Sequence, residues 1–321
     1  MDTPIQAPLP FPLVDRHTHL EGALDPRWVR TEANRRGWQL PASLETLWNG
    51  AGAPFTGFIE AFLFGAALLD HREAIREAVR AVARRTVQAE GAGFDLWISP
   101  HFLVVHQGQI SLAELWQGVE EGLQEATRMD LQSCVVVEAV NHFGPKHGHA
   151  TLDLVLPDLP AFVKGFSTGG LEGCPFREWA PVFDRARAAG LSISAHAGEN
   201  GPGSNVREAL LEGGVSRIVH GIRADDATLD LLAERGIPVD ICLTSNAALA
   251  ADVAPHPLPR MLRAGVRCAL GTDDPGVIPC DLKTETMAAR RLGLNEDDLN
   301  RLWRYGAEDA WCHATGKPDR T

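Results

Sequence analysis

Eight short apolar segments, each suited to a buried strand, alternate along the chain with segments of helical pattern. Strict alternation is typical of a parallel sheet, because each strand returns to the same edge through a helix. Eight such units in 321 residues fit a closed (β/α)8 barrel, the TIM barrel, better than an open doubly wound sheet. No G-x-G-x-x-G run follows the first strand, so a dinucleotide-binding fold has no support. The predicted strands are 11–19, 94–99, 133–138, 161–166, 191–196, 217–220, 238–243 and 266–271.

We predict a single domain over residues 1–321, because no linker, repeat or low-complexity tract interrupts the alternation. Residues 71–90 have a strong helical pattern closed by Gly91-Ala-Gly93, and 111–129 opens with a capping box, Ser111-Leu-Ala-Glu114. Residues 26–70 are rich in Trp and Phe and lie directly after the first strand. We expect them to form a helical or irregular, lid-like insertion over a pocket mouth.

Composition narrows the possible partners. The formal net charge is −12 and no basic block stands out, so neither nucleic acid nor an anionic membrane surface is expected as a partner. The first residues lack a signal-peptide pattern, and no window reaches the ~18 apolar residues of a membrane span, which predicts a cytoplasmic protein. Six scattered cysteines without a C-x-x-C pair argue against a zinc ribbon or a disulfide framework.

Histidines and aspartates end four of the predicted strands. His17 and His19 lie two residues apart on the first strand and therefore on one face. His196 ends the fifth strand, His220 ends the sixth, and the eighth runs into Asp273-Asp274. Barrel enzymes hold their chemistry at the carboxyl ends of the strands. Imidazole nitrogens with one carboxylate oxygen suit a divalent transition metal, zinc first.

Each of these features has a simpler interpretation when it stands alone. Glu199 would be an ordinary acid in the first turn of a helix, and His220 a core histidine. Their joint occurrence at the ends of separate strands favours one shared site. Lys164, in the predicted fourth strand, is a further candidate, because a lysine on that strand can bridge two metals in related barrels. It precedes the end of its strand, so a packed or snorkelling side chain and a single metal are favoured.

The motifs around these residues resemble those of the adenosine deaminase family in the amidohydrolase superfamily. The resemblance covers nearly the whole chain, and His-Ala-Gly-Glu combined with Thr-Asp-Asp-Pro is specific to that family. The matching motifs are His17-Thr-His19-Leu-Glu-Gly22, His196-Ala-Gly-Glu199, Val219-His220-Gly221, Thr244-Ser-Asn246 and Gly271-Thr-Asp-Asp-Pro275.

The resemblance implies a barrel of metallo-dependent hydrolase type that deaminates a 6-aminopurine, such as adenosine or deoxyadenosine, with one Zn²⁺ per chain. It also implies the site residues: zinc ligands His17, His19, His196 and Asp273; catalytic residues Glu199 and His220; substrate-binding residues Glu21, Gly170 and Asp274.

The chemistry of the side chains agrees with these roles. Zinc lowers the pKa of a bound water toward neutrality, and the resulting hydroxide attacks C6 of the purine. The ring accepts this attack when N1 is protonated, which a buried Glu199 with a raised pKa supplies. His220 would orient the hydroxide, and Asp274 would hydrogen-bond to the nucleophile or to N7.

Three substrate-side positions depart from the family pattern: Glu21 replaces aspartate, Ser167 replaces an acid, and Leu243 replaces proline. The longer acid makes free adenine or a modified nucleoside (N6-substituted, or aminodeoxyfutalosine) an alternative substrate. Two other functions stay open: an amidohydrolase with two metals bridged by a carboxylated Lys164, and a non-catalytic purine-binding barrel. Deamination, rather than one particular purine, is the prediction.

Overall fold

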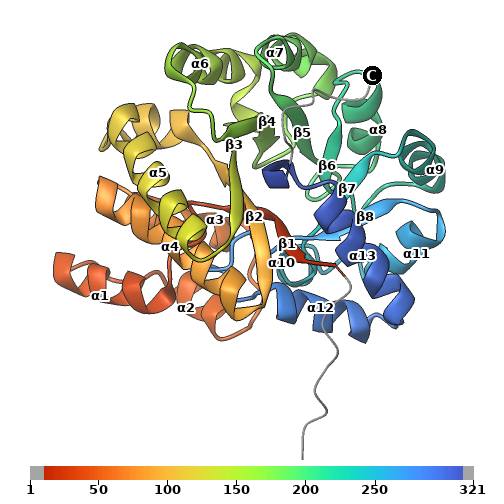
Figure 1. Ribbon diagram of the computed structural model, residues 1–321, viewed down its shortest axis with the longest axis horizontal. Helices are drawn as coiled ribbons and strands as arrows, with labels where there is room; N and C mark the ends of the chain where they lie inside the picture. The colour runs from red at the N-terminus through yellow and green to blue at the C-terminus, as the bar shows by residue number, and fades with distance from the viewer. Residues whose placement is uncertain (1–10, 314–321) are drawn as a thin grey trace, which may run out of the picture.

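A computed structural model describes residues 11–313. Its eight parallel strands pair in chain order, from β1 to β8, and form the barrel that the alternating pattern predicts (Figure 1). The strands are β1 (Leu13–His19), β2 (Gly91–Ile98), β3 (Gln132–Val140), β4 (Val163–Gly169), β5 (Ser192–Ala197), β6 (Arg217–His220), β7 (Pro238–Ile241) and β8 (Arg267–Leu270).

The barrel closes between β1 and the residues that follow β8. The backbone N–H of His19 donates to the Asp273 carbonyl at 2.7 Å, and that of Asp273 donates to the His17 carbonyl at 2.8 Å. Asp15 of β1 reinforces this seam by accepting from the backbone N–H and the hydroxyl of Thr272, at 3.0 and 2.6 Å. The metal-type ligands of the first and last strands are therefore held side by side by the closure itself.

Helices surround the barrel (Figure 1). They are α1 (Pro26–Arg36), α2 (Ala42–Trp48), α3 (Phe55–Ala67), α4 (Arg72–Gln88), α5 (Leu112–Arg128), α6 (Pro145–Val155), α7 (Phe176–Ala188), α8 (Ser204–Leu211), α9 (Asp226–Arg235), α10 (Leu243–Leu249), α11 (Leu258–Arg263), α12 (Leu282–Arg291) and α13 (Glu296–Glu308). A π-helical segment, η1 (Phe102–Gln107), and three short 3-10 helices, η2 (Asn141–Phe143), η3 (Leu156–Asp158) and η4 (Trp311–His313), complete the list.

The predicted capping box at Ser111 and Glu114 is present at the start of α5. Gly91 and Gly93, by contrast, do not close a helix but belong to β2. The turn before them uses Glu90, whose φ is +61°. A Cβ atom at Gly93 would collide with the Gln132 carbonyl of β3, so this glycine permits the close approach of two strands.

Two layers fill the barrel below the histidines. Arg16 and Arg217 pair with two buried carboxylates, Arg16 with Asp240 at 3.1 Å and Arg217 with Asp95 at 2.9 Å. Above them, the ring of Trp97 lies 4.3 Å from that of His17. This packed interior leaves the chemistry at the carboxyl ends of the strands.

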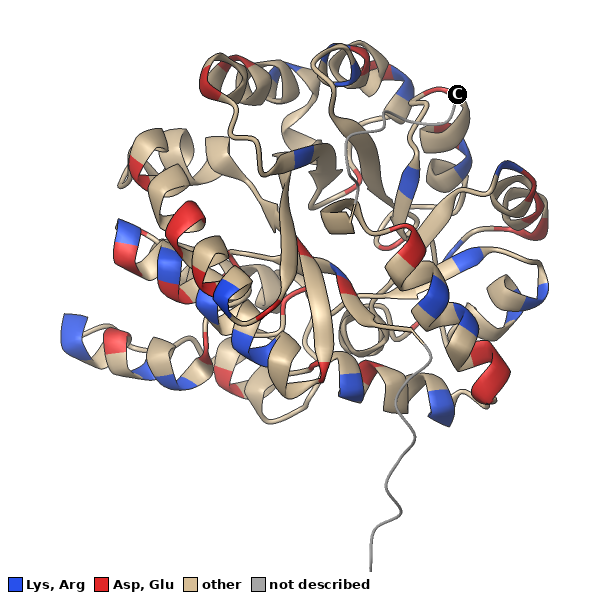
Figure 2. Ribbon diagram, viewed as in Figure 1, with Lys and Arg blue, Asp and Glu red and all other residues tan. Residues whose placement is uncertain are grey.

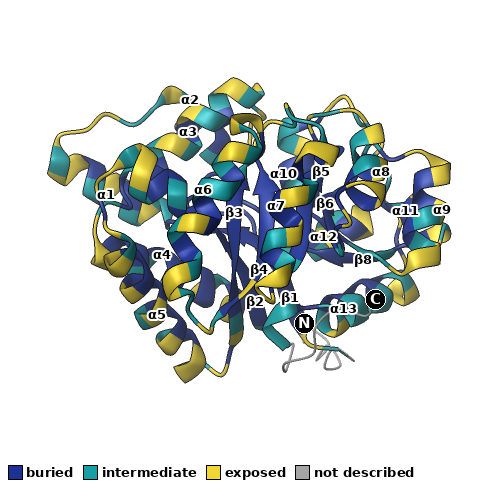
Figure 3. Ribbon diagram, turned by 90° about the horizontal axis from the view of Figure 1, so that it is seen from above, coloured by how far each residue is buried: buried dark blue, intermediate teal, exposed yellow. Residues whose placement is uncertain are grey.

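The outer faces of the helices are exposed while the strands are buried (Figure 3). In the view of Figure 2, acidic and basic residues lie interspersed on these outer faces. Among residues 11–313, no helix combines the length and apolar character that crossing a membrane requires.

Candidate active site

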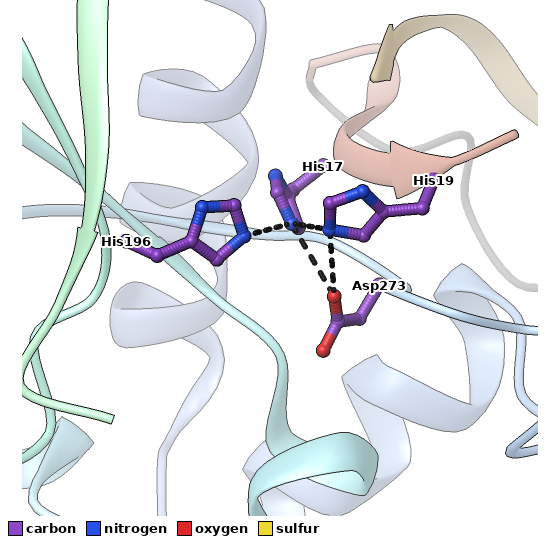
Figure 4. A group of neighbouring side chains, drawn as sticks. All are labelled: His17, His19, His196 and Asp273. Atoms are coloured by element: carbon purple, nitrogen blue, oxygen red, sulfur yellow. Dashed lines mark hydrogen bonds and ion pairs between the residues drawn. The ribbon is translucent and has the colours of Figure 1, made fainter. Parts of the chain in front are cut away.

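Four side chains from three strand ends converge at the carboxyl end of the barrel (Figure 4). His17 Nε2 lies 3.0 Å from His19 Nε2, 3.1 Å from His196 Nε2 and 3.3 Å from Asp273 Oδ1. His19 Nε2 lies 3.4 Å from the same Asp273 oxygen. The structure thus brings together all four residues that the sequence analysis assigned to a metal.

The donor set fits a zinc ion. Two ligand atoms held 2.0–2.1 Å from a tetrahedral ion are roughly 3.3 Å apart, close to the spacings observed here. The Nδ1–H of His196 donates to the Thr168 carbonyl at 2.8 Å, which leaves the Nε2 lone pair directed at the other three ligands. Burial lowers the pKa of His17 to about 3, so this imidazole too is neutral and able to ligate.

Asp273 supplies the negative charge of the cluster. Burial alone would raise its pKa, but the contacts with His17 and His19 hold that pKa well below the usual range. A second group of possible ligands joins Asp273 to His220 and Cys242. Burial raises the pKa of the Cys242 thiol well above its usual value, and because the thiolate is the form that ligates, the three-histidine cluster is the better metal site.

Two of the site residues have left-handed backbone conformations. His220 and Asp273 both have φ of +64°, a region that non-glycine residues rarely occupy. Such strain is concentrated at functional sites, where the surrounding structure holds it in place.

Glu199 and His220 face each other beside the cluster. Glu199 Oε1 lies 3.6 Å from His220 Nε2, and both side chains are buried. Burial raises the pKa of Glu199, and the negative charges of Asp273 and Glu172 raise it further against the opposing effect of His220. A carboxyl group whose pKa is raised in this way is suited to donate a proton.

Glu199 and His220 both line a cavity of about 240 Å³. Its wall includes His19, His196, Glu199, His220, Asp273, Asp274 and Gly170, together with apolar side chains of α3 and η1. Burial and the neighbouring Asp273 raise the pKa of Asp274 well above its usual value, so this carboxyl can donate a hydrogen bond. Gly22 packs against Asp274 so closely that a Cβ there would collide with the carboxylate.

Glu21 lies beside this cavity and does not form part of its lining. Its Oε1 atom accepts from the backbone N–H of Ser99 at 2.8 Å, and the side chain is buried. Ser99 itself does line the cavity. Glu21 is therefore placed to shape the wall through Ser99.

Glu138 belongs to the cavity wall and was missed by the sequence analysis. It is buried, with Oε2 3.3 Å from His196 Nδ1, and burial raises its pKa to about 7. Gly169 leaves room for it, since a Cβ at that position would meet the carboxylate. The predicted third strand ended at Glu138, so the strand-end rule that selected the histidines would have found this acid.

Glu172 was also missed, and it organises the loop that carries Glu199. Its Oε1 accepts from the backbone N–H groups of Glu199, Asn200 and Gly201 at 2.8–3.1 Å. Its Oε2 accepts from Gly198 N at 2.8 Å and Asn205 Nδ2 at 2.7 Å. No local pattern signals this role, because the five donors lie 26 or more residues away in the chain.

Lys164 lies away from the site. It is exposed, at the second residue of β4 and thus near the amino end of that strand. It therefore cannot bridge two metals at the carboxyl end of the barrel, and the binuclear alternative loses its bridging residue.

The family-model comparison and the comparison with known proteins agree with each other. The family model described as Adenosine deaminase matches residues 12–319. An adenine deaminase of Cupriavidus pinatubonensis is 32% identical, covering 94% of this chain and 87% of the relative. An adenosine deaminase of Escherichia coli is 31% identical, covering 96% of both chains.

Solved structures share the fold. An amidohydrolase of Burkholderia ambifaria, determined with bound Zn, has a TM-score of 0.83 at 21% identity, covering 94% of this chain and 86% of that one. A protein of Arabidopsis complexed with IMP has a TM-score of 0.75 at 21% identity, covering 94% of this chain and 97% of that one.

Proposed function

The chain belongs to the adenosine deaminase family, and we propose that it catalyses the zinc-dependent hydrolytic deamination of a 6-aminopurine. Water replaces the 6-amino group, so that ammonia and a 6-oxopurine leave. The observation that carries this proposal is the convergence of three imidazoles and one carboxylate beside a buried acid in a single cavity.

One zinc ion per chain would be held by His17, His19, His196 and Asp273. When bound, the ion supplies a water whose pKa is lowered toward neutrality. The set contains one carboxylate and three imidazoles, and Lys164 is remote, so the proposal is for a single ion and not for a pair.

The side chains around the cluster would handle the protons of the reaction. Glu199 would donate a proton to N1 of the purine, which makes C6 electrophilic. His220, whose Nε2 atom lies 3.6 Å from Glu199 Oε1, would orient the attacking oxygen. Asp274 and the Gly170 backbone would hold the purine edge, with the protonated Asp274 donating to N7.

The substrate is proposed to be adenosine or deoxyadenosine, with free adenine as the second candidate because Glu21 replaces the usual aspartate. A phosphorylated substrate, as suggested by the IMP-bound neighbour, is disfavoured. Within residues 11–313, the side chains that line the cavity include neither lysine nor arginine, so a phosphate would have no strong cationic partner there.

A panel of 6-aminopurines tests the proposed function directly. Zinc-loaded protein is mixed with adenosine, deoxyadenosine, adenine, AMP and N6-methyladenosine. Both the ultraviolet absorbance change and the released amine are followed, which is methylamine for N6-methyladenosine and ammonia for the others. We expect turnover of at least one unphosphorylated purine and little turnover of AMP. Zinc-loaded protein that releases neither ammonia nor, from N6-methyladenosine, methylamine would contradict the proposal.

The substitution Glu21→Asp tests the second substrate candidate. The shorter acid should lose its hold on Ser99 N and open the cavity wall on that side, which favours the bulkier nucleoside. A change of one methylene supports an increase of roughly tenfold in the adenosine-to-adenine ratio of kcat/KM. The exposed Glu212→Asp variant is the control, and an unchanged ratio in Glu21→Asp would show that this residue does not govern substrate choice.

The substitution Glu172→Gln tests the control of Glu199 by its loop. The amide would turn an NH₂ group toward backbone N–H donors that now meet a carboxylate oxygen. We expect kcat to fall about 10–100-fold, as for the loss of an outer-shell partner, with zinc content unchanged. Glu178→Gln on the exposed face of α7 is the matched control, and a wild-type kcat in Glu172→Gln would rule out this role.

The remaining expectations stay proposals. The segment from α1 to α3 would act as a lid, since Phe55, Phe58 and Phe62 of α3 line the cavity. The assignment to one domain, the cytoplasmic location and the lack of nucleic-acid or membrane partners stay predictions from the sequence.

A further inference from the structure

A chain of hydrogen bonds leads from His220 away from the cavity. Asn246 Nδ2 lies 3.1 Å from His220 Nδ1, and His256 Nε2 lies 3.2 Å from Asn246 Oδ1. The chain ends at the backbone N–H of Leu258, which donates to His256 Nδ1 at 3.1 Å. His220 and Asn246 are both buried, so water does not compete for the contact between them.

The last of these bonds fixes the direction of all the others. A backbone N–H only donates, so His256 Nδ1 accepts and the hydrogen of this ring is on Nε2. Burial lowers the pKa of His256 to about 4, which keeps the ring neutral near pH 7. His256 Nε2–H then donates to Asn246 Oδ1, the amide nitrogen faces His220, and His220 Nδ1 must accept.

The consequence concerns the other nitrogen of His220. Since Nδ1 accepts, the hydrogen of the neutral ring is on Nε2, the atom that faces Glu199 and the cavity. We propose that Asn246 and His256 are positioning residues that hold His220 in this tautomer, so that Nε2–H can donate to the oxygen attacking the purine. This inference rests on the proposed deamination, in which His220 orients that oxygen.

The surroundings of Asn246 favour one fixed orientation of its side-chain amide. Asn246 lies on α10, directly after β7, and the first turn of this helix is held by the buried Glu285 of α12. Glu285 accepts from the backbone N–H groups of Leu243 and Thr244 at 2.6 and 3.0 Å. The start of α10, the helix that carries Asn246, is therefore held in place. The amide nitrogen and the amide oxygen of Asn246 contact two different histidines.

The substitution Asn246→Asp is the sharpest test, because a carboxylate accepts from both histidines. The hydrogen of His220 should move to Nδ1, leaving a lone pair on Nε2. The tautomer is measured by ¹⁵N NMR of the histidine-labelled, zinc-loaded protein, with His220 assigned from the signal lost in His220→Gln. We expect a protonated Nε2 in the wild type, a protonated Nδ1 in Asn246→Asp, and a roughly 100-fold lower kcat with similar KM and zinc content.

A pair of His256 variants tests the outer part of the chain and covers the case in which Asn246→Asp does not fold. His256→Leu removes the donor to Asn246 and should lower kcat about tenfold. His256→Gln retains an N–H donor and should recover most of that loss. The exposed Asn34→Asp variant on α1 is the control.

The proposal is overturned if the wild type carries its His220 hydrogen on Nδ1, or if His256→Leu and His256→Gln have equal kcat. The NMR result does not depend on turnover. A failed substrate panel with a protonated Nε2 would therefore reject the proposed reaction while leaving the hydrogen-bond chain established.

Discussion

Replacing Glu199 by glutamine is expected to lower kcat about 10³-fold while zinc remains bound, because the amide keeps the shape of the acid but cannot donate its proton to N1. Glu199 is buried and is not among the four clustered ligands, so the metal site should not respond to the change. The measurement is steady-state deamination of the preferred purine together with metal analysis of the dialysed protein.

The pH dependence of this variant adds a second readout. Burial raises the pKa of Glu199, so its proton is present below that pKa and is lost as the pH rises through it. The wild-type kcat should therefore fall on the alkaline side, and the residual rate of Glu199→Gln should lack this fall. Glu212→Gln, at an exposed position after α8, is the matched control. A near-normal kcat in Glu199→Gln would remove this residue from the chemistry.

Replacing Asp273 by alanine is expected to release zinc on dialysis and reduce turnover to background. Asp273 supplies the one carboxylate of the cluster, 3.3–3.4 Å from His17 and His19 Nε2, and without it only three imidazoles, with no negative charge, would face the cation. Losing a ligand should weaken binding by more than the roughly 10–100-fold typical of an outer-shell partner. Zinc should raise the Tm of the wild type and leave that of the variant unchanged, since only a bound ligand stabilises the fold.

Asp273→Asn separates loss of the ligand from loss of the fold. Asparagine tolerates the left-handed backbone that Asp273 adopts, so this variant should fold while still lacking the charge. Asp230→Ala, on the exposed face of α9, is the control. Full zinc occupancy in both Asp273 variants would contradict the ligand assignment.

The sequence predicts the barrel well because its signals are local. A buried parallel strand and an amphipathic helix each leave a pattern in a few consecutive residues, as β3 and the capped helix α5 show. The ends of parallel strands meet at one edge, so the sequence alone predicts that residues such as His196 and Asp273 lie close together. The same logic applied to β3 would have included Glu138.

Other features leave no local pattern. The turn before β2 uses Glu90 in a left-handed conformation, and the glycines after it serve strand packing, so a helix-stop interpretation of Gly91 and Gly93 was wrong. Glu21, just after β1, turns toward Ser99 because the backbone N–H of Ser99, just after β2, donates to its carboxylate. Sequence position identifies the residue but not the partner of its carboxylate.

By itself, then, the sequence determined the barrel and the family, and it predicted the residues proposed as ligands, since each follows from short-range patterns and from the shared polarity of parallel strands. Only the tertiary structure decided which groups tune those ligands. Glu172 contacts the backbone of Glu199, and Asn246 and His256 form the hydrogen-bond chain to His220. These three residues lie in loops and short helices, and the packing of the folded chain brings those segments close to the site. Hydrogen bonds require partners within about 3 Å, and between residues distant in the chain that proximity is a property of the folded molecule.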